Sequence, residues 1–434
     1  MIDLAHDKKS VATETCCQAI DIPARSTQAK STPSYHARAT SYPANAYLRV
    51  RPVRLTAFGP LAGIKVVDLT SMVFGPYATQ VMADLGAEVI KIEAPGGDAT
   101  RYINVGPSED LGGVFTNINR GKKSVELDLR NEAHKHALRG LIAEADVFIH
   151  SMRGKAIAKL GFDYAKVSAI KPDIVYTNCY GYSRRGPDGD KPAYDDTIQA
   201  ECGIPHVQGL MNGEPGFAAT IMADKIAGLH GLYATLAALF HRARTGEGQE
   251  VEIGMFEAMS SFMLVEHASG MLFDPPLGPA HYHRAVSPMR RPYKTRDGYL
   301  AALVYNDKHW DAFMAAIQPE WQSDEFDTLK KRAKHIDRIY ALLAETFATR
   351  TTQEWLDLLT PLQIPCARVK STDELFDDPH LNAIGFFEEV ESDVGTIRYP
   401  GVPTWFSKTP GKVAGPTPHL GADNAALLGN ERSD

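Results

Sequence analysis

Strand-like and helix-like segments alternate through residues 64–183, and this alternation constrains the fold more than any other feature of the sequence. The stretch LAGIKVVDLT has the near-continuous apolar pattern of a buried strand, and GPYATQVMADLGA then places Tyr77, Val81 and Leu85 four residues apart on one helix face. The alternation continues with the strands EVIKIEAP and SVELDL, the helix NEAHKHALRGLIAEA, the strand DVFIHS, the helix AIAKLGFDYAKVSAI and the strand DIVYTNCYGYS. This order predicts an α/β fold with a parallel sheet covered by helices on both faces.

The first strand-to-helix turn of this predicted sheet has the sequence TSMVFGP. A dinucleotide fingerprint needs glycines at this turn, because the pyrophosphate must approach the backbone closely. The sheet is therefore expected to be Rossmann-like, but the turn argues against a nicotinamide dinucleotide as its ligand.

The rest of the chain differs from residues 64–183 in composition and in hydrophobic pattern. Residues 1–55 are rich in Ser, Thr, Ala and Pro without hydrophobic periodicity, which predicts a disordered extension. From about residue 260 the chain is Pro-rich and irregular, as expected of a linker with a functional loop. A smaller unit follows, with the strand YLAALVY and the helices KHWDAFMAAI, HIDRIYALLAETFAT and TTQEWLDLLTPL, and the tail is again loop-like.

Composition excludes several classes of partner and location. The 434 residues include 46 Lys and Arg and 53 Asp and Glu, which gives a net charge of −7. This charge gives no reason to expect nucleic acid or an anionic membrane surface as a binding partner. No apolar run reaches the roughly 18–20 residues of a membrane span. The charged start MIDLAHDKKS does not resemble a signal peptide. The five cysteines are odd in number and lack metal-ligand spacing, so reduced thiols in a cytoplasmic protein are expected.

Asp224 stands at the head of an apolar helix expected over residues 225–244 and ended by Gly246. The simplest interpretation is that its carboxylate caps the helix and complements the helix dipole. The small residues Ala227, Gly228 and Gly231 favour a second interpretation, because they let another backbone or a substrate approach the first turn. An ionised carboxylate at such a place can attack an acyl carbon.

Other charged clusters allow both a structural and a functional interpretation. Asp195 and Asp196 precede a helix in KPAYDDTIQAECG and are suited to cap it. Two basic segments are either solvated loops or phosphate-binding sites, and they contain Arg120, Lys122 and Lys123, and Arg153, Lys155 and Lys159. The sequence has no HExxH motif, no paired His/Cys spacing for a metal and no GxSxG elbow of a serine hydrolase.

The order of these segments resembles CoA-transferase family III, the CaiB/BaiF group. The resemblance begins with LAGIKVVDLTSMVFGPYATQVMADLGAEVIKIEAPGGDATR and continues through NRGKKSVELDL, ADVFIHSMRGKAIAKLGF, YGYSRRGP, AYDDTIQAECG, MADKIAG, RTGEGQEVEIGMFEA and IPCARVKSTDEL. It covers roughly residues 60–425 and leaves out the N-terminal extension.

This resemblance implies a Rossmann-like large domain built from both ends of the chain, a small α/β domain and long linkers, in two subunits that interlock as a homodimer. Applied to this sequence, it divides the chain into the extension at 1–55, the first part of the large CoA-binding domain at 56–255, a linker at 256–285, the small domain at 286–362, and a linker that returns to the large domain at 363–434.

The resemblance also implies site residues. The family's nucleophile is the Asp of the segment that corresponds to MADKIAG, which is Asp224 here. Coenzyme A, as a co-substrate and not a tightly bound cofactor, is then expected to contact the turn at Val73 and Phe74, the segment from Leu127 to Arg130, and the residues Ser151, Met152, Arg153 and Lys159, with Tyr194 and Asp195 closing the site. No metal is expected.

Three departures from the family pattern narrow the expected activity. Many relatives have Asn where this chain has Ser151, and relatives that racemise 2-methylacyl-CoA have His where it has Tyr194, which is a poor base at neutral pH. Oxalate-type transferases carry a glycine run that HRAVSPMRRPYKT lacks. The adjacent Arg290 and Arg291 in that segment either bind an acceptor carboxylate or form a solvated pair.

The predicted activity is therefore transfer of CoA from an acyl-CoA to a small carboxylic acid, through an aspartyl anhydride and an aspartyl-CoA thioester on Asp224. The alternatives are a 2-methylacyl-CoA racemase and a CoA-ester dehydratase or isomerase of the same fold. A catalytically silent CoA-binding subunit is the alternative from another class, and the intact Asp224 argues against it.

Overall fold

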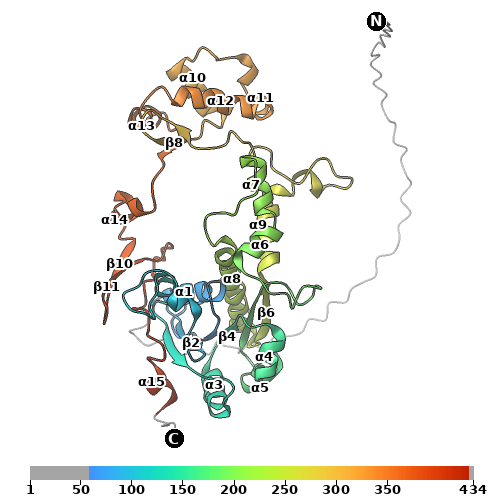
Figure 1. The fold of residues 1–434 in the computed structure, drawn as a ribbon, viewed down its shortest axis with the longest axis vertical. Helices are drawn as coiled ribbons and strands as arrows, with labels where there is room; N and C mark the ends of the chain where they lie inside the picture. Colours follow the sequence, from blue (N-terminus) through green and yellow to red (C-terminus); the bar gives the residue numbers. More distant parts are fainter. Residues whose placement is uncertain (1–57, 430–434) are drawn as a thin grey trace, which may run out of the picture. The chain divides into compact units, whose positions relative to one another are not determined.

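The computed structural model describes residues 58–429. The extension predicted at 1–55, with its two cysteines, lies outside the described residues. Figure 1 traces the order of the helices and strands along the chain.

A six-stranded parallel sheet forms the centre of the large domain. Its strands are β1 (Lys65–Leu69), β2 (Glu88–Glu93), β3 (Lys123–Glu126), β4 (Val147–His150), β5 (Val175–Tyr180) and β6 (Gln249–Gly254). They lie in the order β3-β2-β1-β4-β5-β6, and each neighbouring pair is parallel. This is the doubly wound order of Rossmann-like sheets, with the direction of winding reversed between β1 and β4. The predicted parallel α/β sheet is confirmed.

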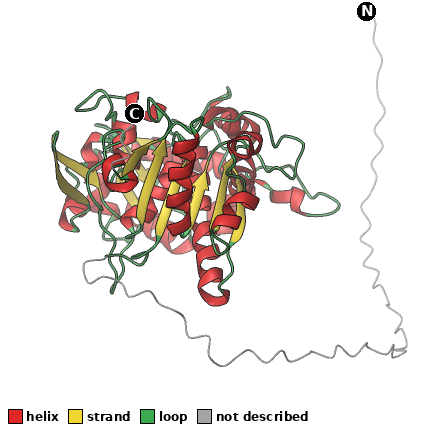
Figure 2. Ribbon diagram, turned by 90° about the horizontal axis from the view of Figure 1, so that it is seen from below, coloured by secondary structure: helices red, strands yellow, loops and turns green. Residues whose placement is uncertain are grey.

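Successive residues of the strands point to opposite faces of this sheet, and each face has its own hydrophobic core. Val66 packs in one core with residues of α1 (Phe74–Asp84), α8 (Met222–Thr245) and α9 (Met255–His267). The next residue, Val67, packs in the other core with residues of the opposite layer of helices, which are α3 (Glu132–Glu144), α4 (Gly154–Leu160) and α5 (Tyr164–Ile170). Figure 2 shows helices on both sides of the strands.

The single helix predicted from AIAKLGFDYAKVSAI is wrong, because this segment forms the two helices α4 and α5. Gly161 ends α4 in the left-handed conformation, with φ of 90°. The carboxylate of Asp163 then accepts a hydrogen bond from the backbone N–H of Lys166 and starts α5. The break lets two short helices pack separately against the same core.

A separate core lies in the segment after α9. Its antiparallel sheet contains β7 (Tyr293–Lys294), β8 (Tyr299–Ala302) and β9 (Cys366–Arg368), in that order. The helices around it are α10 (Asp307–Ile317), α11 (Leu329–Lys334), α12 (Ile336–Phe347) and α13 (Thr352–Leu359). Aromatic rings in mutual contact, among them Phe313, Phe347 and Trp355, fill this core.

The C-terminal segment returns to the large sheet. After the hairpin of β10 (Phe387–Ser392) and β11 (Gly395–Pro400), the chain reaches α15 (Asn424–Leu428) beside β3. The backbone N–H of Ser124 donates to the Asp423 carboxylate at 2.8 Å, and that of Glu126 donates to Asn424 Oδ1 at 2.9 Å. These contacts satisfy donors on the outer edge of β3.

The remaining helices are α2 (Gly113–Ile118), α6 (Asp195–Glu201), α7 (Ile204–Asn212) and α14 (Pro379–Ala383). Within residues 58–429, no helix combines the length and the apolar character needed to cross a membrane.

Candidate active site

Asp224 is the third residue of α8, and its carboxyl group faces the first turn of α1. The backbone N–H of Phe74, the first residue of α1, donates a hydrogen bond to this carboxyl. The two helices approach closely because residue 228 is glycine: a Cβ there would lie 2.8 Å from the carbonyl oxygen of Phe74. The expected close approach of a second backbone to the first turn of α8 is confirmed.

The capping role that residue type suggested for Asp224 is wrong. The helix starts at Met222, earlier than predicted, and its N-cap is Ile221, which makes no side-chain cap. A different carboxylate supplies the cap, since the backbone N–H of Asp224 donates to Asp195 Oδ1 at 3.0 Å. The side chain of Asp224 therefore does not cap α8, but its place in the first turn still complements the helix dipole, as expected.

Asp195 is buried at the start of α6 and fixed by Gln199. The Gln199 side-chain amide donates to Asp195 Oδ2 at 2.5 Å and to the carbonyl of Thr220 at 3.2 Å, while its oxygen accepts the N–H of Ala218 at 2.9 Å. Gln199 therefore joins the Asp195 carboxylate to the loop that enters α8.

The electrostatic surroundings make Asp224 an unusually basic carboxylate. Burial disfavours its ionised form and the nearby Asp195 carboxylate repels it, so the pKa of Asp224 is raised to about 7, although the Phe74 N–H acts in the opposite direction. Within the described part of the chain, no lysine or arginine forms an ion pair with it. Strongly shifted pKa values of buried carboxyl groups are concentrated at functional sites.

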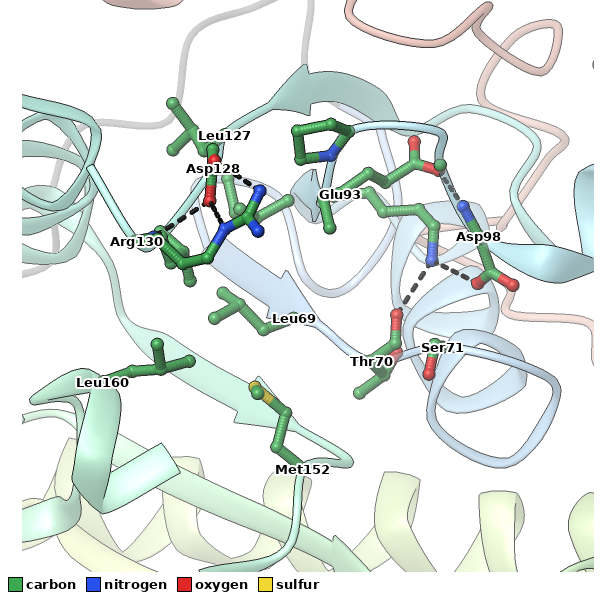
Figure 3. Close-up of a pocket in the computed structure, with 16 residues that line it drawn as sticks. Leu69, Thr70, Ser71, Glu93, Asp98, Leu127, Asp128, Arg130, Met152 and Leu160 are labelled. Carbon is green, nitrogen blue, oxygen red and sulfur yellow. Dashed lines mark hydrogen bonds and ion pairs between the residues drawn. The ribbon is translucent and has the colours of Figure 1, made fainter. Parts of the chain in front are cut away.

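A pocket of about 410 Å³ opens at the carboxyl ends of the central strands. This position is where open α/β sheets bind ligands, beside the reversal between β1 and β4. Figure 3 shows the residues around it, which are Leu69, Thr70, Ser71, Lys91, Ile92, Glu93, Ala94, Pro95, Gly97, Asp98, Leu127, Asp128, Leu129, Arg130, Met152 and Leu160. Because Ser71 lines the pocket and Phe74 contacts Asp224, one short turn connects the two sites.

Three of the predicted CoA contacts, Leu127, Arg130 and Met152, line this pocket. Arg130 is exposed, and its guanidinium forms two hydrogen bonds of 2.8 Å with the Asp128 carboxylate. Asp128 and Arg130 thus add charged groups to a pocket that is also lined by the apolar side chains of Leu127, Met152 and Leu160 (Figure 3).

The other predicted contacts lie around the pocket or apart from it. The side chains of Val73 and Phe74 are buried in or beside the core, so this turn presents its backbone. Ser151 accepts the backbone N–H of Ser71 at 3.0 Å and thereby joins β4 to the turn. The exposed predicted contacts outside the pocket lining are Arg153, Lys159 and Tyr194.

Sequence reasoning missed Lys91 and Asp98, which form a fully buried ion pair of 3.0 Å in the pocket wall. A signal for them was present, because Lys91 interrupts the apolar strand EVIKIEAP. A lysine in a buried strand requires a buried partner.

Both interpretations of the basic segment at 120–123 are wrong for Arg120 and Lys122. Arg120 is buried and pairs with Asp84 at 2.6 Å. Lys122 is buried and donates to Asp68 at 3.1 Å and to the carbonyl of Pro76 at 3.0 Å. Both side chains are bound by buried groups of β1 and α1, which they join, and so they are not available to a phosphate.

Within residues 58–429, no group of three or more His, Cys, Asp or Glu side chains is arranged to hold a metal ion. The cysteines in this part of the chain, Cys179, Cys202 and Cys366, are free thiols.

Comparisons with known sequences and structures show what the chain is similar to. A sequence model described as CoA-transferase family III matches residues 61–424. The succinate–glutarate CoA-transferase of Agrobacterium fabrum is 31% identical over 386 residues, covering 85% of this chain and 95% of that protein. The formyl-CoA:oxalate CoA-transferase of Shigella sonnei is 32% identical over 397 residues, with coverage of 85% and 95%. A crystal structure of a mutant of the Rv3272 protein of Mycobacterium tuberculosis has 29% sequence identity and a TM-score of 0.75, and the match covers 86% of this chain and 100% of that one.

The doubly wound sheet with a pocket at its switch point is the arrangement in which open α/β folds bind ligands. Since the family model spans most of the chain, the protein belongs to CoA-transferase family III. It is a CoA-transferase, with coenzyme A as co-substrate.

Proposed function

We propose that this enzyme transfers CoA from an acyl-CoA to a small carboxylic acid, with Asp224 as the nucleophile. The observation that carries the proposal is the position of the Asp224 carboxyl, which faces the Phe74 N–H and is freed from capping by Asp195. The N-termini of α1 and α8 both favour negative charge at this point. The same N–H can hold the oxyanion that forms when the carboxyl becomes an acyl group.

The proposed reaction exchanges one activated acyl bond for another. An oxygen of the Asp224 carboxylate attacks the thioester carbon, the C–S bond breaks, and the thiolate leaves with its electron pair, which gives an aspartyl–acyl anhydride. The thiolate then attacks the Asp224 carbonyl and releases the first acid as a carboxylate. The acceptor carboxylate attacks the resulting aspartyl-CoA thioester, the C–S bond breaks, and the thiolate leaves an anhydride between Asp224 and the acceptor. The thiolate then attacks the acceptor's acyl carbon, which forms the new thioester and releases Asp224 as a carboxylate.

We propose that the pocket holds part of the CoA handle. Its volume of about 410 Å³ lies within the usual range for ligand sites. Leu127 and Met152 would pack against apolar parts of CoA, and Arg130 would contact a polar group of CoA. The other proposed contacts are Val73, Phe74, Ser151, Arg153, Lys159, Tyr194 and Asp195. Binding energy from this remote handle positions the thioester at Asp224.

The acceptor is proposed to be a dicarboxylic acid other than oxalate. The named relatives include a succinate–glutarate CoA-transferase, which supports dicarboxylates as a class. The relative named for oxalate is equally similar in overall identity, but the segment HRAVSPMRRPYKT lacks a glycine run, which disfavours oxalate.

Racemase and dehydratase or isomerase activities are weaker candidates. A racemase would need a base where this chain has Tyr194, whose side chain is exposed. A dehydratase or isomerase would act on a CoA ester without an acceptor acid, so omission of the acceptor separates it from a transferase.

We further propose an interlocked, cytoplasmic homodimer with the domain division given above, changed at two boundaries: α9 belongs to the large domain, because it packs in the core of the large sheet, and the small domain includes β9, because it pairs with β8. The separate aromatic core after α9 and the hydrogen bonds from Asp423 and Asn424 to β3 support a small domain followed by a return to the large one. The free thiols support a reducing compartment. Interlocked subunits have no separable folded monomer, so sedimentation should give a dimer down to nanomolar concentration. A reversible monomer–dimer equilibrium at micromolar concentration would contradict interlocking.

The deciding experiment combines trapping with substitution. Acyl-CoA supplied without an acceptor, then quenched and digested, should leave an acyl or CoA mass on the peptide that contains Asp224. Asp224→Asn should show no adduct and no turnover while it still binds CoA, because a neutral amide cannot attack a thioester. Activity of Asp224→Asn close to that of the wild type would refute the mechanism.

A further inference from the structure

The turn between β1 and α1 contains a residue in a conformation that L-amino acids seldom adopt. Met72 has φ of 64°, in the left-handed region, although it is not glycine. Such a conformation persists only where its surroundings hold it, and it is concentrated at functional sites. Met72 lies two residues before Phe74, so its backbone sets the direction in which α1 begins.

The contacts of Met72 show what holds it. Its backbone N–H donates to Asp98 Oδ1 at 3.3 Å. The other oxygen of this carboxylate, Oδ2, accepts the ammonium of Lys91 at 3.0 Å, and Lys91 also donates to the carbonyl of Thr70 at 2.9 Å. Lys91, which contacts Thr70, and Asp98, which contacts Met72, thus hold the turn on both sides of Ser71.

Asp98 is itself rigidly placed. Its backbone N–H donates to Glu93 at 2.9 Å, and its carboxylate accepts the backbone N–H of Thr100 at 3.0 Å and the Thr100 hydroxyl at 2.8 Å. Burial acts to raise the pKa of Asp98, but Lys91 and the Thr100 N–H outweigh it and keep the pKa below its usual value. Asp98 is therefore a fixed, ionised acceptor at the strained turn.

We propose that Asp98 is a positioning residue of the transfer reaction. It holds Met72 in the left-handed conformation and thereby aims the Phe74 N–H at the carboxyl of Asp224. This inference rests on the proposed role of Asp224 as nucleophile. Since Asp98, Lys91, Thr70 and Ser71 also line the pocket, the group that orients the turn borders the site proposed for CoA.

The first test compares Asp98→Asn with a rescue. In Asp98→Asn the acceptor at the turn is weakened, so kcat should fall at least about tenfold, which is less than the roughly 100- to 1,000-fold cost of removing one oxyanion donor outright. The KM for acyl-CoA should change by less than about threefold, because the pocket keeps its shape. Glycine adopts positive φ without strain, so adding Met72→Gly to Asp98→Asn should restore most of the lost kcat. A stably folded double variant without recovery would overturn the inference.

A second variant covers the outcome in which Asp98→Asn fails to fold because Lys91 loses its buried partner. Met72→Val leaves the ion pair intact but places a β-branched residue where φ is positive, and it should reproduce the loss of kcat. Thr100→Val is the matched comparison, since it removes one of several contacts to Asp98 and leaves the Met72 N–H in place, so its loss of kcat should be smaller than that of Met72→Val. Equal kcat in Met72→Val and the wild type would contradict the proposal.

A readout independent of turnover separates this inference from the proposed function. Carbon NMR of labelled Asp224 reports the pKa of its carboxyl, which should rise in Met72→Val as the Phe74 N–H turns away. If the wild type forms no adduct but this pKa rises, the transfer mechanism fails and the positioning role stands. If the wild type forms the adduct but the pKa is unchanged, the positioning role fails and the mechanism stands.

Discussion

Oδ1 of Asp195 lies 3.0 Å from the backbone nitrogen of Asp224, so the Asp195 carboxylate caps the N-terminus of the helix that carries Asp224. The same contact brings a negative charge close to the Asp224 side chain and contributes to its raised pKa. A single residue therefore serves as a helix cap and as an electrostatic influence on the proposed nucleophile. These two effects can be separated, because Asn is also a good helix cap but carries no charge.

The rate of acyl transfer should depend on the ionisation of Asp224. Since only the carboxylate attacks the thioester, kcat/KM should rise with pH up to a plateau, with a midpoint of about 7. In Asp195→Asn this midpoint should move to lower pH, because the repulsion that disfavours the ionised form is removed. A pH profile of each enzyme with one acyl-CoA checks this. The variant should still form the covalent adduct, and a midpoint that moves upward would contradict the electrostatic role.

Asp224→Asn should be more stable than the wild type at pH 8. The folded-state pKa of about 7 lies above the ordinary value of 3.8, so ionisation of Asp224 costs folding free energy. The cost is absent below about pH 4, grows as the pH rises, and is complete above about pH 7. After discounting for solvent screening, the gain at pH 8 should be about 1–3 kcal/mol. Thermal melting of both proteins from pH 5 to pH 8 measures it, and a gain that does not grow with pH would count against the raised pKa.

Lys122→Met should destabilise the protein, while Lys123→Met should not. The first change leaves the Asp68 carboxylate buried without its partner, which costs about 3 kcal/mol, or several degrees in melting temperature. Lys123 makes its ion pair with Glu88 at the surface, where such a pair contributes about 0–1 kcal/mol. Equal melting temperatures for the two variants would show that the buried pair does not hold β1 and α1 together.

Arg290→Ala and Arg291→Ala test the acceptor site. If an Arg at this position binds the second carboxylate, KM for a dicarboxylate acceptor should rise about tenfold or more while KM for acyl-CoA stays within about twofold. Arg291 already donates to the carbonyl of Pro288 from its guanidinium, so the larger effect is expected at Arg290. A monocarboxylate acceptor serves as the control, and equal effects on both acceptors would refute the assignment.

The parallel sheet could be predicted from the sequence because buried parallel strands have a strong signal. Runs such as IKVVDL are apolar on both faces, and the helices between them have a clear periodicity. The break at Gly161 was missed, because a glycine inside a periodic helical segment is often tolerated. The order of the strands follows from no local pattern and needed the hydrogen bonds of the structure.

The candidate site was only partly predictable. Asp224 could be singled out, but its partners could not, because Asp195 and Phe74 approach it through packing of α6 and α1 against α8. Arg120 and Lys122 were misjudged for the same reason. Their sequence neighbours are polar, while their spatial neighbours, such as Asp68 and Asp84, lie far away along the chain.

The contacts of Asp423 and Asn424 with β3 have a consequence for the newly made chain. Strands β1 to β6 leave the ribosome long before the segment that covers the outer edge of β3. Until residues 423 and 424 have been synthesised, the backbone donors of Ser124 and Glu126 remain open to pairing with a strand from another nascent chain. The period of greatest risk of aggregation is therefore expected during translation, after the sheet has been assembled and before its edge is covered.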